Sequence, residues 1–316
     1  MPIKIPNDLP ARAVLEAEGV DVIRESDAIR QDIRPLRLAL LNLMPNKIRT
    51  ETQIARLVGS TPLQVEMTLL KTASHETRNT PEDHLLTFYR TWADVRDEYF
   101  DGLIVTGAPI ETLPFEDVDY WDELTQILDW SLEHVYSAFY ICWGAQAALQ
   151  HFYGVPKYQL PRKRFGVFEH EIVRLHTPLL RGFNDRFPIP VSRHTEVRSE
   201  DIPEVPGLHI LAESEGSGLC LVEDVRRRAV YMFNHLEYDA TTLKEEYERD
   251  LREGLDIQLP CNYFPGDDPS REPPNMWRAN AHLLFWNWIG AVYQGTPYDV
   301  GAIRPEPDLP RWPRAT

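Results

Sequence analysis

A cysteine lies where a short apolar run changes into a run of small residues. The segment Ser137-Ala-Phe-Tyr-Ile-Cys142-Trp-Gly-Ala-Gln-Ala-Ala predicts a strand that ends at Cys142 and a helix that begins directly after it. Enzymes with α/β folds present an exposed nucleophile at such a turn. The helix dipole and the free N–H groups there favour a thiolate and later an oxyanion. Free cysteines are also commonly buried in cores, so this segment alone leaves both interpretations open.

A cysteine nucleophile needs a base and a group that orients the base. Among the ten histidines, His235 follows a predicted strand over 228–233, and Glu237 comes two residues later. Residues i and i+2 of an extended backbone point to the same side, so Glu237 could accept the ring N–H and stabilise the imidazolium. The alternative is a polar turn without chemistry. The presence of Cys142 at a strand end of the same predicted sheet favours a Cys–His–Glu catalytic set.

Thiolate attack on a carbonyl produces an oxyanion, which needs two N–H donors. The amide of Trp143, directly after the cysteine, is the first predicted donor. The second is expected from the turn Thr106-Gly107-Ala108-Pro109 after the neighbouring strand, where glycine permits close approach of the backbone. The alternative is that this segment is an ordinary turn without a catalytic role, since such turns have the same composition.

The elements that must position these residues alternate between strand and helix in the first half of the chain. Strands are expected over 37–43, 65–70, 102–106 and 138–141. Helices are expected from the capping box at 50–53 to Gly59, after Thr80 with Pro81 in the first position, and over 121–135. This alternation predicts a doubly wound, mostly parallel α/β sheet flanked by helices. Ligands of such sheets bind at the carboxyl edge of the strands.

The second half has strand-like segments without long helices between them. They cover 167–173, 208–213, 218–223 and 228–233, and helices are expected near 240–253 and 277–293. We expect these strands to extend the sheet in antiparallel fashion. The interpretation is a single domain over 1–302 that starts with an irregular or partly helical lead-in over 1–34. The proline-rich tail over 303–316 is expected to be disordered.

Composition and charge exclude several classes of function. The hydrophobic fraction of 43% and the charged fraction of 26% are ordinary for a globular protein. The net charge of −16, without a basic stripe, argues against a nucleic-acid partner. No apolar run reaches the roughly 18 residues of a membrane span, and the N-terminus lacks the features of a signal peptide, so a cytoplasmic protein is expected. Three scattered cysteines suit neither a disulfide framework nor a metal site.

Longer blocks of sequence carry a family resemblance. The strand–cysteine–helix turn, the later His-x-Glu and the Gly-x-Pro turn resemble class I glutamine amidotransferase domains, although Tyr140 stands where those domains usually have glycine. Seven further blocks closely resemble the homoserine O-acyltransferases built on that fold, and the resemblance covers about residues 1–300. The blocks are 42–53, 74–81, 100–109, 142–143, 235–239, 262–265 and 296–299.

The resemblance implies an acyl transfer in two steps. The family's cysteine takes an acyl group from acyl-coenzyme A and passes it to the hydroxyl of L-homoserine, in methionine biosynthesis. Cys142, His235 and Glu237 match its nucleophile, base and orienting acid. The order is ping-pong, with no metal and no permanently bound cofactor, and acetyl-coenzyme A is the expected co-substrate. A homodimer is also expected from the resemblance.

The resemblance also implies residues that bind the acceptor. Lys163, Ser192 and Arg249 match the family's substrate positions. The guanidinium of Arg249 suits a bidentate contact with the homoserine carboxylate, and Glu246, one turn earlier, could bind the ammonium group. A surface ion pair between these two helical residues is the alternative. Lys47, at the ligand-binding edge, could meet coenzyme A phosphates or simply be solvated.

The choice of acyl group is expected to depend on Glu111, with Ser192 also at a specificity position. In the resembling family, glycine at the first position accompanies succinyl transfer and glutamate accompanies acetyl transfer. Two like charges ~4 Å apart repel by about 4 kcal/mol at an effective dielectric constant near 20, roughly a thousandfold against succinyl. Glutamate facing solvent would discriminate nothing. The interpretation is a homoserine O-acetyltransferase; the alternatives are the succinyl-transferring enzyme, a glutamine amidase and a non-enzymatic binding protein.

Overall fold

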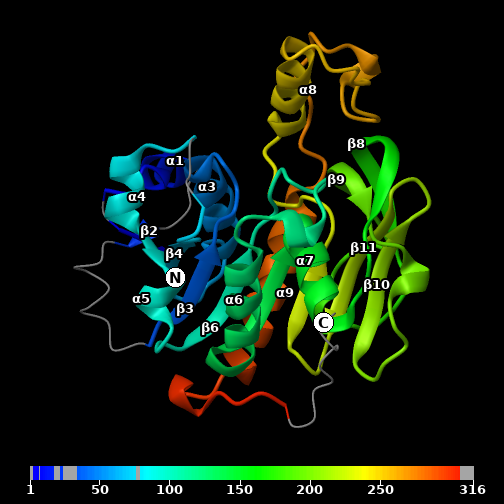
Figure 1. Ribbon diagram of the computed structural model, residues 1–316. Helices are drawn as coiled ribbons and strands as arrows, with labels where there is room; N and C mark the ends of the chain where they lie inside the picture. The colour runs from blue at the N-terminus through cyan, green and yellow to red at the C-terminus, as the bar shows by residue number, and fades with distance from the viewer. Residues whose placement is uncertain (1–2, 7, 18–21, 24–33, 76–78, 307–316) are drawn as a thin grey trace.

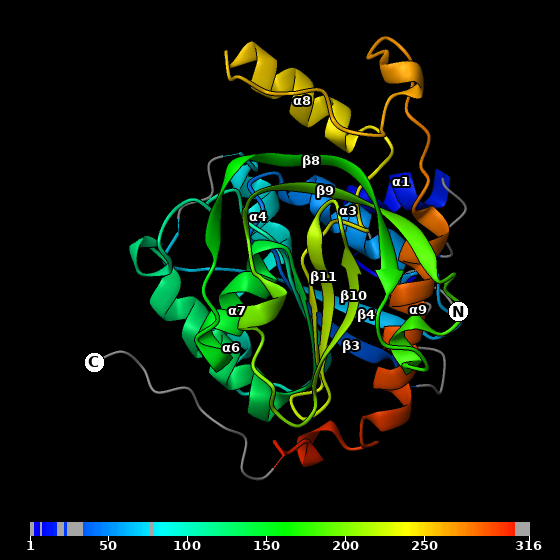
Figure 2. The same cartoon turned by 90° about the vertical axis from the view of Figure 1, so that its right-hand side faces the viewer.

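The computed structural model describes residues 3–6, 8–17, 22–23, 34–75 and 79–306, and the described strands form one twelve-stranded sheet (Figures 1 and 2). The strands are β1 (Ile3–Lys4), β2 (Val22–Ile23), β3 (Leu36–Leu41), β4 (Val65–Lys71), β5 (Tyr89–Thr91), β6 (Phe100–Val105), β7 (Val135–Ile141), β8 (Tyr158–Ile172), β9 (Arg186–Glu196), β10 (Leu208–Ser214), β11 (Gly218–Asp224) and β12 (Ala229–Met232). The α-helices are α1 (Ala11–Ala17), α3 (Lys47–Val58), α4 (Glu82–Phe88), α5 (Trp92–Val95), α6 (Trp121–His134), α7 (Trp143–Tyr153), α8 (Thr242–Arg252) and α9 (Arg278–Gly295).

The strand order β2-β1-β4-β3-β6-β7-β12-β11-β10-β8-β9, with β5 beside β4, divides the sheet into two halves. The neighbours from β2 to β12 are parallel, and those from β12 to β9 are antiparallel. The expected fold class is therefore confirmed. Strand β12 joins the halves, since it runs parallel to β7 and antiparallel to β11.

The central parallel strands are apolar because both of their faces are covered. All six residues of β6 are buried. Figure 1 shows α6 and α7 in front of the sheet and α9 behind it. Two hydrophobic cores result: side chains of α1, α3 and α9 pack on one face, and those of α6 and α7 pack on the other.

Two helix starts differ from the expectation. Helix α3 begins one turn before the predicted capping box, because Asn46 is its N-cap and accepts a hydrogen bond from the Arg49 amide at 3.3 Å. Thr50 lies inside the helix. Thr80 does not cap α4; its hydroxyl donates to the Pro45 carbonyl at 2.9 Å and accepts from the Lys47 amide at 3.2 Å. Thr80 therefore joins two loops at the carboxyl edge, which local sequence could not reveal.

The antiparallel half contains a strand that the sequence pattern concealed. Strand β9 lies at the edge of the sheet and pairs with β8, which is much longer than expected. The segment contains Pro188 and Pro190, and proline argues against a strand unless the strand lies at an edge, where a missing N–H is tolerated. Figure 2 shows β8 and β9 arching together beneath α8.

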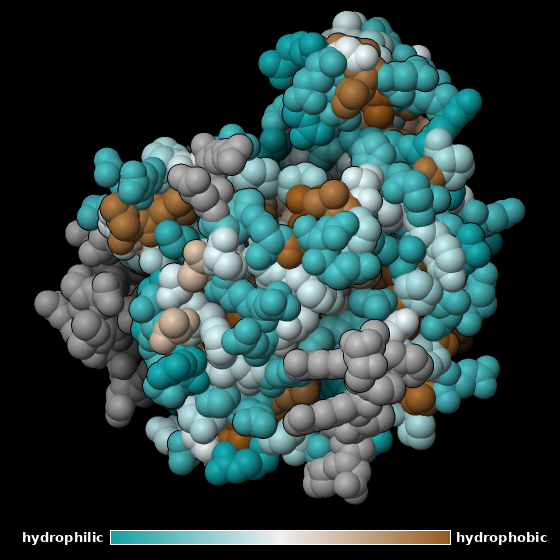
Figure 3. Space-filling view, viewed as in Figure 1, coloured by the Kyte–Doolittle hydropathy of each residue, from teal (hydrophilic) through white to brown (hydrophobic). Residues whose placement is uncertain are grey.

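The two ends of the chain and α8 complete the architecture. In the described parts of the lead-in over 1–34, β1 pairs with β4 and β2, and helix α1 packs into a core. The tail beyond residue 306 lies outside the described residues. Helix α8 and the segment after it project from the body beyond the carboxyl edge of the sheet (Figure 1). Figure 3 shows that the face seen in Figure 1 is covered mainly by hydrophilic residues, with hydrophobic residues in small patches. No helix among the described residues is long and apolar enough to cross a membrane.

Candidate active site

Cys142 lies on a strained turn between β7 and α7. Its backbone has φ 50° and ψ −116°, a conformation that non-glycine residues adopt only where the surroundings enforce it. The Cys142 amide donates to the Met232 carbonyl of β12 at 2.7 Å. A Cβ atom on Gly144 would lie 2.7 Å from the Thr106 carbonyl oxygen, so glycine lets the first turn of α7 pack against the end of β6. The predicted strand–cysteine–helix turn is present.

His235 and Glu237 form the expected hydrogen-bonded pair. The Nδ1 atom of His235 lies 2.7 Å from Oε1 of Glu237, and both side chains are buried. The expected extended backbone is absent, however: the segment is a turn, in which the Tyr238 amide donates to the His235 carbonyl at 3.3 Å. The ring of Tyr238 also stacks on the imidazole, with centroids 4.2 Å apart. The turn and the stacked ring therefore orient the pair.

The parallel pairing of β7 with β12 brings the histidine to the cysteine. Ile141 is opposite Met232 in the register, so the residues that follow both strands meet at one edge. Burial lowers the pKa of His235, but the negative charges of Cys142 and Glu237 and its hydrogen bonds to both residues outweigh burial and raise it well above the usual value. The surroundings of His235 therefore favour its protonated, imidazolium form.

The expected oxyanion donors lie next to the cysteine. A Cβ atom on Gly107 would be 3.2 Å from the Cβ atom of Cys142 and 3.6 Å from the backbone nitrogen of Trp143. Within the described part of the chain, the amides of Trp143, Gly107 and Ala108 have no hydrogen-bond acceptor. Two short stretches of backbone thus present free N–H groups beside Cys142, as an oxyanion hole requires.

Glu246 of α8 connects the predicted substrate residues with the turn that contains His235 and Tyr238. Its Oε2 atom accepts hydrogen bonds from the ammonium of Lys163 on β8, at 3.3 Å, and from the hydroxyl of Ser192 on β9. Its Oε1 atom accepts from the hydroxyl of Tyr238 at 2.8 Å. The structure therefore brings Lys163 and Ser192 together, and Tyr238 links them to His235.

Arg249 belongs to the same cluster through Asp250. Its Nε and Nη2 atoms lie 2.9 and 2.6 Å from Oδ1 of Asp250, and Lys163 donates to Oδ2 at 3.0 Å. Burial raises the pKa of Asp250, but hydrogen bonds from Arg249 and Lys163 outweigh this and lower it. The side chain of Arg249 is 51% exposed, compared with 7% for Lys163. Of these two cations, Arg249 is the more accessible to a dissolved substrate.

Glu111 is held in place against β9 rather than free in solvent. Its carboxylate accepts from the backbone amides of His194, at 2.8 Å, and Thr195, at 3.3 Å. The Thr195 hydroxyl lies 3.2 Å from Oε2 of Glu111 and 3.1 Å from Oε1 of Gln146. Gln146 is one helical turn after Cys142 on α7. The Glu111 carboxylate therefore lies between β9 and helix α7.

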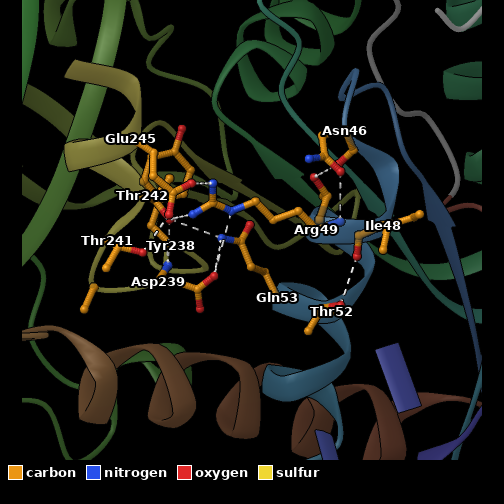
Figure 4. Close-up of polar contacts among 12 residues, drawn as sticks. Asn46, Ile48, Arg49, Thr52, Gln53, Tyr238, Asp239, Thr241, Thr242 and Glu245 are labelled. Atoms are coloured by element: carbon orange, nitrogen blue, oxygen red, sulfur yellow. Dashed lines mark hydrogen bonds and ion pairs between the residues drawn. The ribbon is translucent and has the colours of Figure 1, made fainter. Parts of the chain in front are cut away.

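Helix α3 anchors the loop that follows the His235–Tyr238 turn (Figure 4). Gln53 donates to the Asp239 carboxylate at 3.0 Å, and Arg56 donates to the same group at 2.8 Å. Arg49 forms an ion pair with Glu245, in the first turn of α8. These contacts fasten the base of the projecting helix, and with it Glu246, to the parallel half of the sheet.

Sequence reasoning missed several of these residues and misplaced one. Sequence analysis gave no role to Tyr238, Gln146 or Thr195, although Tyr238 lies in the block 235–239 that carries the family resemblance. Lys47 does not extend into solvent: its side chain is 4% exposed, and its ammonium donates to the Asn42 carbonyl and, at 3.3 Å, to the Met44 carbonyl. Burial lowers the pKa of Lys47 to about 8. No group of three metal-ligating side chains occurs among the described residues.

The sheet and its flanking helices form a class I glutamine amidotransferase-like fold. A solved glutamine amidotransferase from Thermotoga maritima aligns with a TM-score of 0.53 over 83% of this chain and all of that chain, at 15% identity, which shows the fold alone. The sequence model of the homoserine O-succinyltransferase family matches residues 2–298, and the chain belongs to that family. Proteins called homoserine O-acetyltransferase in Hyphomonas neptunium and Brucella melitensis are each 59% identical over 96% of this chain and 99% of their own length. The expected membership of an acyltransferase family is confirmed.

Proposed function

We propose that this protein is a homoserine O-acetyltransferase, which transfers acetyl from acetyl-coenzyme A to the hydroxyl of L-homoserine. The observation that carries the proposal is the Cys142–His235–Glu237 set beside free backbone amides. The family and the names of the relatives support the acceptor. The same resemblance supports a place in methionine biosynthesis, a cytoplasmic location and a homodimer.

The first half-reaction forms a thioester on Cys142. The thiolate attacks the carbonyl carbon of the donor, and the oxyanion accepts hydrogen bonds from the Trp143 amide and the turn at Gly107. When the intermediate collapses, the bond to the coenzyme A sulfur breaks, and the imidazolium of His235 gives its proton to the departing thiolate. The acetyl group then remains on the cysteine and His235 is neutral.

The second half-reaction transfers the acetyl group to homoserine. Neutral His235 removes the hydroxyl proton while the hydroxyl oxygen attacks the thioester, and the thiolate and imidazolium are restored. Glu237 keeps the imidazole oriented through its 2.7 Å contact with Nδ1. Arg249 offers a guanidinium for the acceptor carboxylate, and Glu246, already bound to Lys163 and Ser192, can accept from the ammonium group.

The acetyl donor is favoured by the placement of Glu111. Its carboxylate already accepts from the backbone amides of β9, so a succinyl carboxylate entering there meets a like charge and occupied donors. Succinyl-coenzyme A is the second candidate, because the family model carries the succinyltransferase name. Glutamine hydrolysis is less well supported: Tyr140 replaces the usual glycine, is 1% exposed and stacks on Tyr231 in a core.

Intact-mass measurement tests the proposal. The protein is incubated with acetyl- or succinyl-coenzyme A without homoserine. We expect an acetyl adduct on Cys142 that is absent in Cys142→Ala and is discharged by added L-homoserine but not by L-glutamine. No adduct from either donor would contradict the covalent mechanism, and a succinyl adduct alone would contradict the donor assignment.

A further inference from the structure

The described residues that line one groove all lie between Leu43 and Tyr120, so none of them belongs to β8, β9 or α8. The groove has a volume of about 550 Å³ and runs between the loop after β3 and the segment after β6. Much of its lining is apolar: Met44 and Pro45 come from the loop after β3, and Pro109, Ile110 and Leu113 come from the segment after β6. The volume is that of a typical small-molecule site.

The groove and the gap beside the catalytic residues share one wall residue. Met44 lines both the groove and the narrow gap that His235 and Gly107 also line. Ala108, another wall residue, directly follows Gly107, whose Cα faces Cys142 so closely that an added Cβ would be 3.2 Å from the cysteine Cβ. A molecule lying in the groove would therefore bring its end to the nucleophile and the oxyanion amides.

The loop after β6 lines the groove on one side and contacts β9 on the other. Pro109 and Ile110 face the groove, whereas the next residue, Glu111, directs its carboxylate to β9. The acceptor residues Lys163 and Ser192 lie on β8 and β9, on that second side. An acyl group on Cys142 can thus extend toward Glu111 while the rest of its donor extends into the groove.

The chemistry of the rim limits what part of a donor the groove can hold. Asp117 and Asp119 are exposed at the rim, and Asp119 lies 2.7 Å from Nδ1 of His75. The ammonium of Lys47, the lysine in the wall, is turned to backbone carbonyls. Carboxylates repel phosphates, so these walls suit a long, uncharged, largely apolar chain and not a nucleotide.

We propose that the groove binds the pantetheine arm of the acyl-coenzyme A donor and that the nucleotide end remains outside the rim. The inference rests on the proposed function, because it assumes a thioester donor. The arm lies along Pro109, Ile110 and Leu113, its thioester reaches Cys142, and L-homoserine enters from the side of Arg249. The two substrates therefore use separate walls of one centre.

Three acetyl donors of decreasing length test the proposal. Acetyl-coenzyme A contains the arm and the nucleotide, acetyl-pantetheine contains the arm alone, and S-acetylcysteamine lacks almost all of both. The rate of Cys142 acetylation is measured by intact mass for the wild type, Ile110→Ser and Leu113→Ser. Leu175→Ser is the matched control, because Leu175 is 61% exposed and does not line the groove.

For each groove variant, we expect the second-order rate constant of Cys142 acetylation to fall roughly tenfold with the two donors that contain the arm. Losing one apolar contact in a pocket has about this effect. The rate with S-acetylcysteamine, the KM for L-homoserine and the control should be unchanged. Equal losses with all three donors, no loss with any, or a loss with acetyl-coenzyme A alone would each overturn the groove assignment. Failure of the wild type to acquire any acyl adduct would instead overturn the proposed function.

Discussion

Replacing Glu111 by glycine should convert the donor preference from acetyl to succinyl. In the wild type, the Glu111 carboxylate occupies the amides of His194, at 2.8 Å, and Thr195, at 3.3 Å. Removing the side chain both deletes a negative charge and frees these donors. A succinyl group, which ends in a carboxylate, can then take the place of the glutamate. The substitution therefore exchanges a repulsive site for a binding site.

The magnitude follows from Coulomb's law. A succinyl carboxylate held ~4 Å from that of Glu111 is destabilised by about 4 kcal/mol at an effective dielectric constant near 20. Relief of this repulsion predicts a gain of roughly a thousandfold in kcat/KM for succinyl-coenzyme A. For the uncharged acetyl group, we expect a change of less than about tenfold, because only the packing near Gln146 and Thr195 is altered.

Steady-state kinetics with both donors measure the effect, and Glu111→Gln separates its two causes. Glutamine removes the charge but keeps the side chain, so we expect a smaller gain for succinyl than in Glu111→Gly. If Glu111→Gly keeps its acetyl activity and gains nothing with succinyl-coenzyme A, the carboxylate does not face the acyl group and the reasoning is wrong.

Three further predictions concern the remaining site residues. Glu237→Gln should slow Cys142 acetylation by roughly 10²- to 10⁴-fold without loss of folding, as measured by intact mass and circular dichroism; an unchanged rate would remove Glu237 from the mechanism. Because the pKa of His235 is raised, its stabilising contribution is fully present below the ordinary histidine pKa and is lost as the pH rises through the raised value. The difference in unfolding free energy between the wild type and His235→Asn should therefore become smaller as the pH rises. Denaturant titrations in which this difference grows with pH would contradict the prediction. Arg249→Lys should raise the KM for L-homoserine at least about tenfold with an unchanged rate of Cys142 acetylation, and a change in acetylation alone would place Arg249 on the donor side.

The sequence by itself determined the features that depend on neighbours along the chain. The switch from apolar to small residues around Cys142 indicated the strand–helix turn, and the free Trp143 amide follows from that turn. The alternation of elements indicated the parallel half of the sheet. The spacing of His235 and Glu237 indicated their contact, although the cause is a turn and not an extended backbone.

Only the tertiary structure decided how the residues proposed to bind the acceptor come together. Lys163, Ser192 and Glu246 come from β8, β9 and α8, and they meet because β9 pairs with β8 beneath the base of α8. The prolines of β9 concealed that strand, since a local pattern cannot show that it lies at an edge. Likewise, Glu111 has β9 amides as partners more than eighty positions away in sequence. Such contacts depend on strand order and register, which no local spacing of residues encodes.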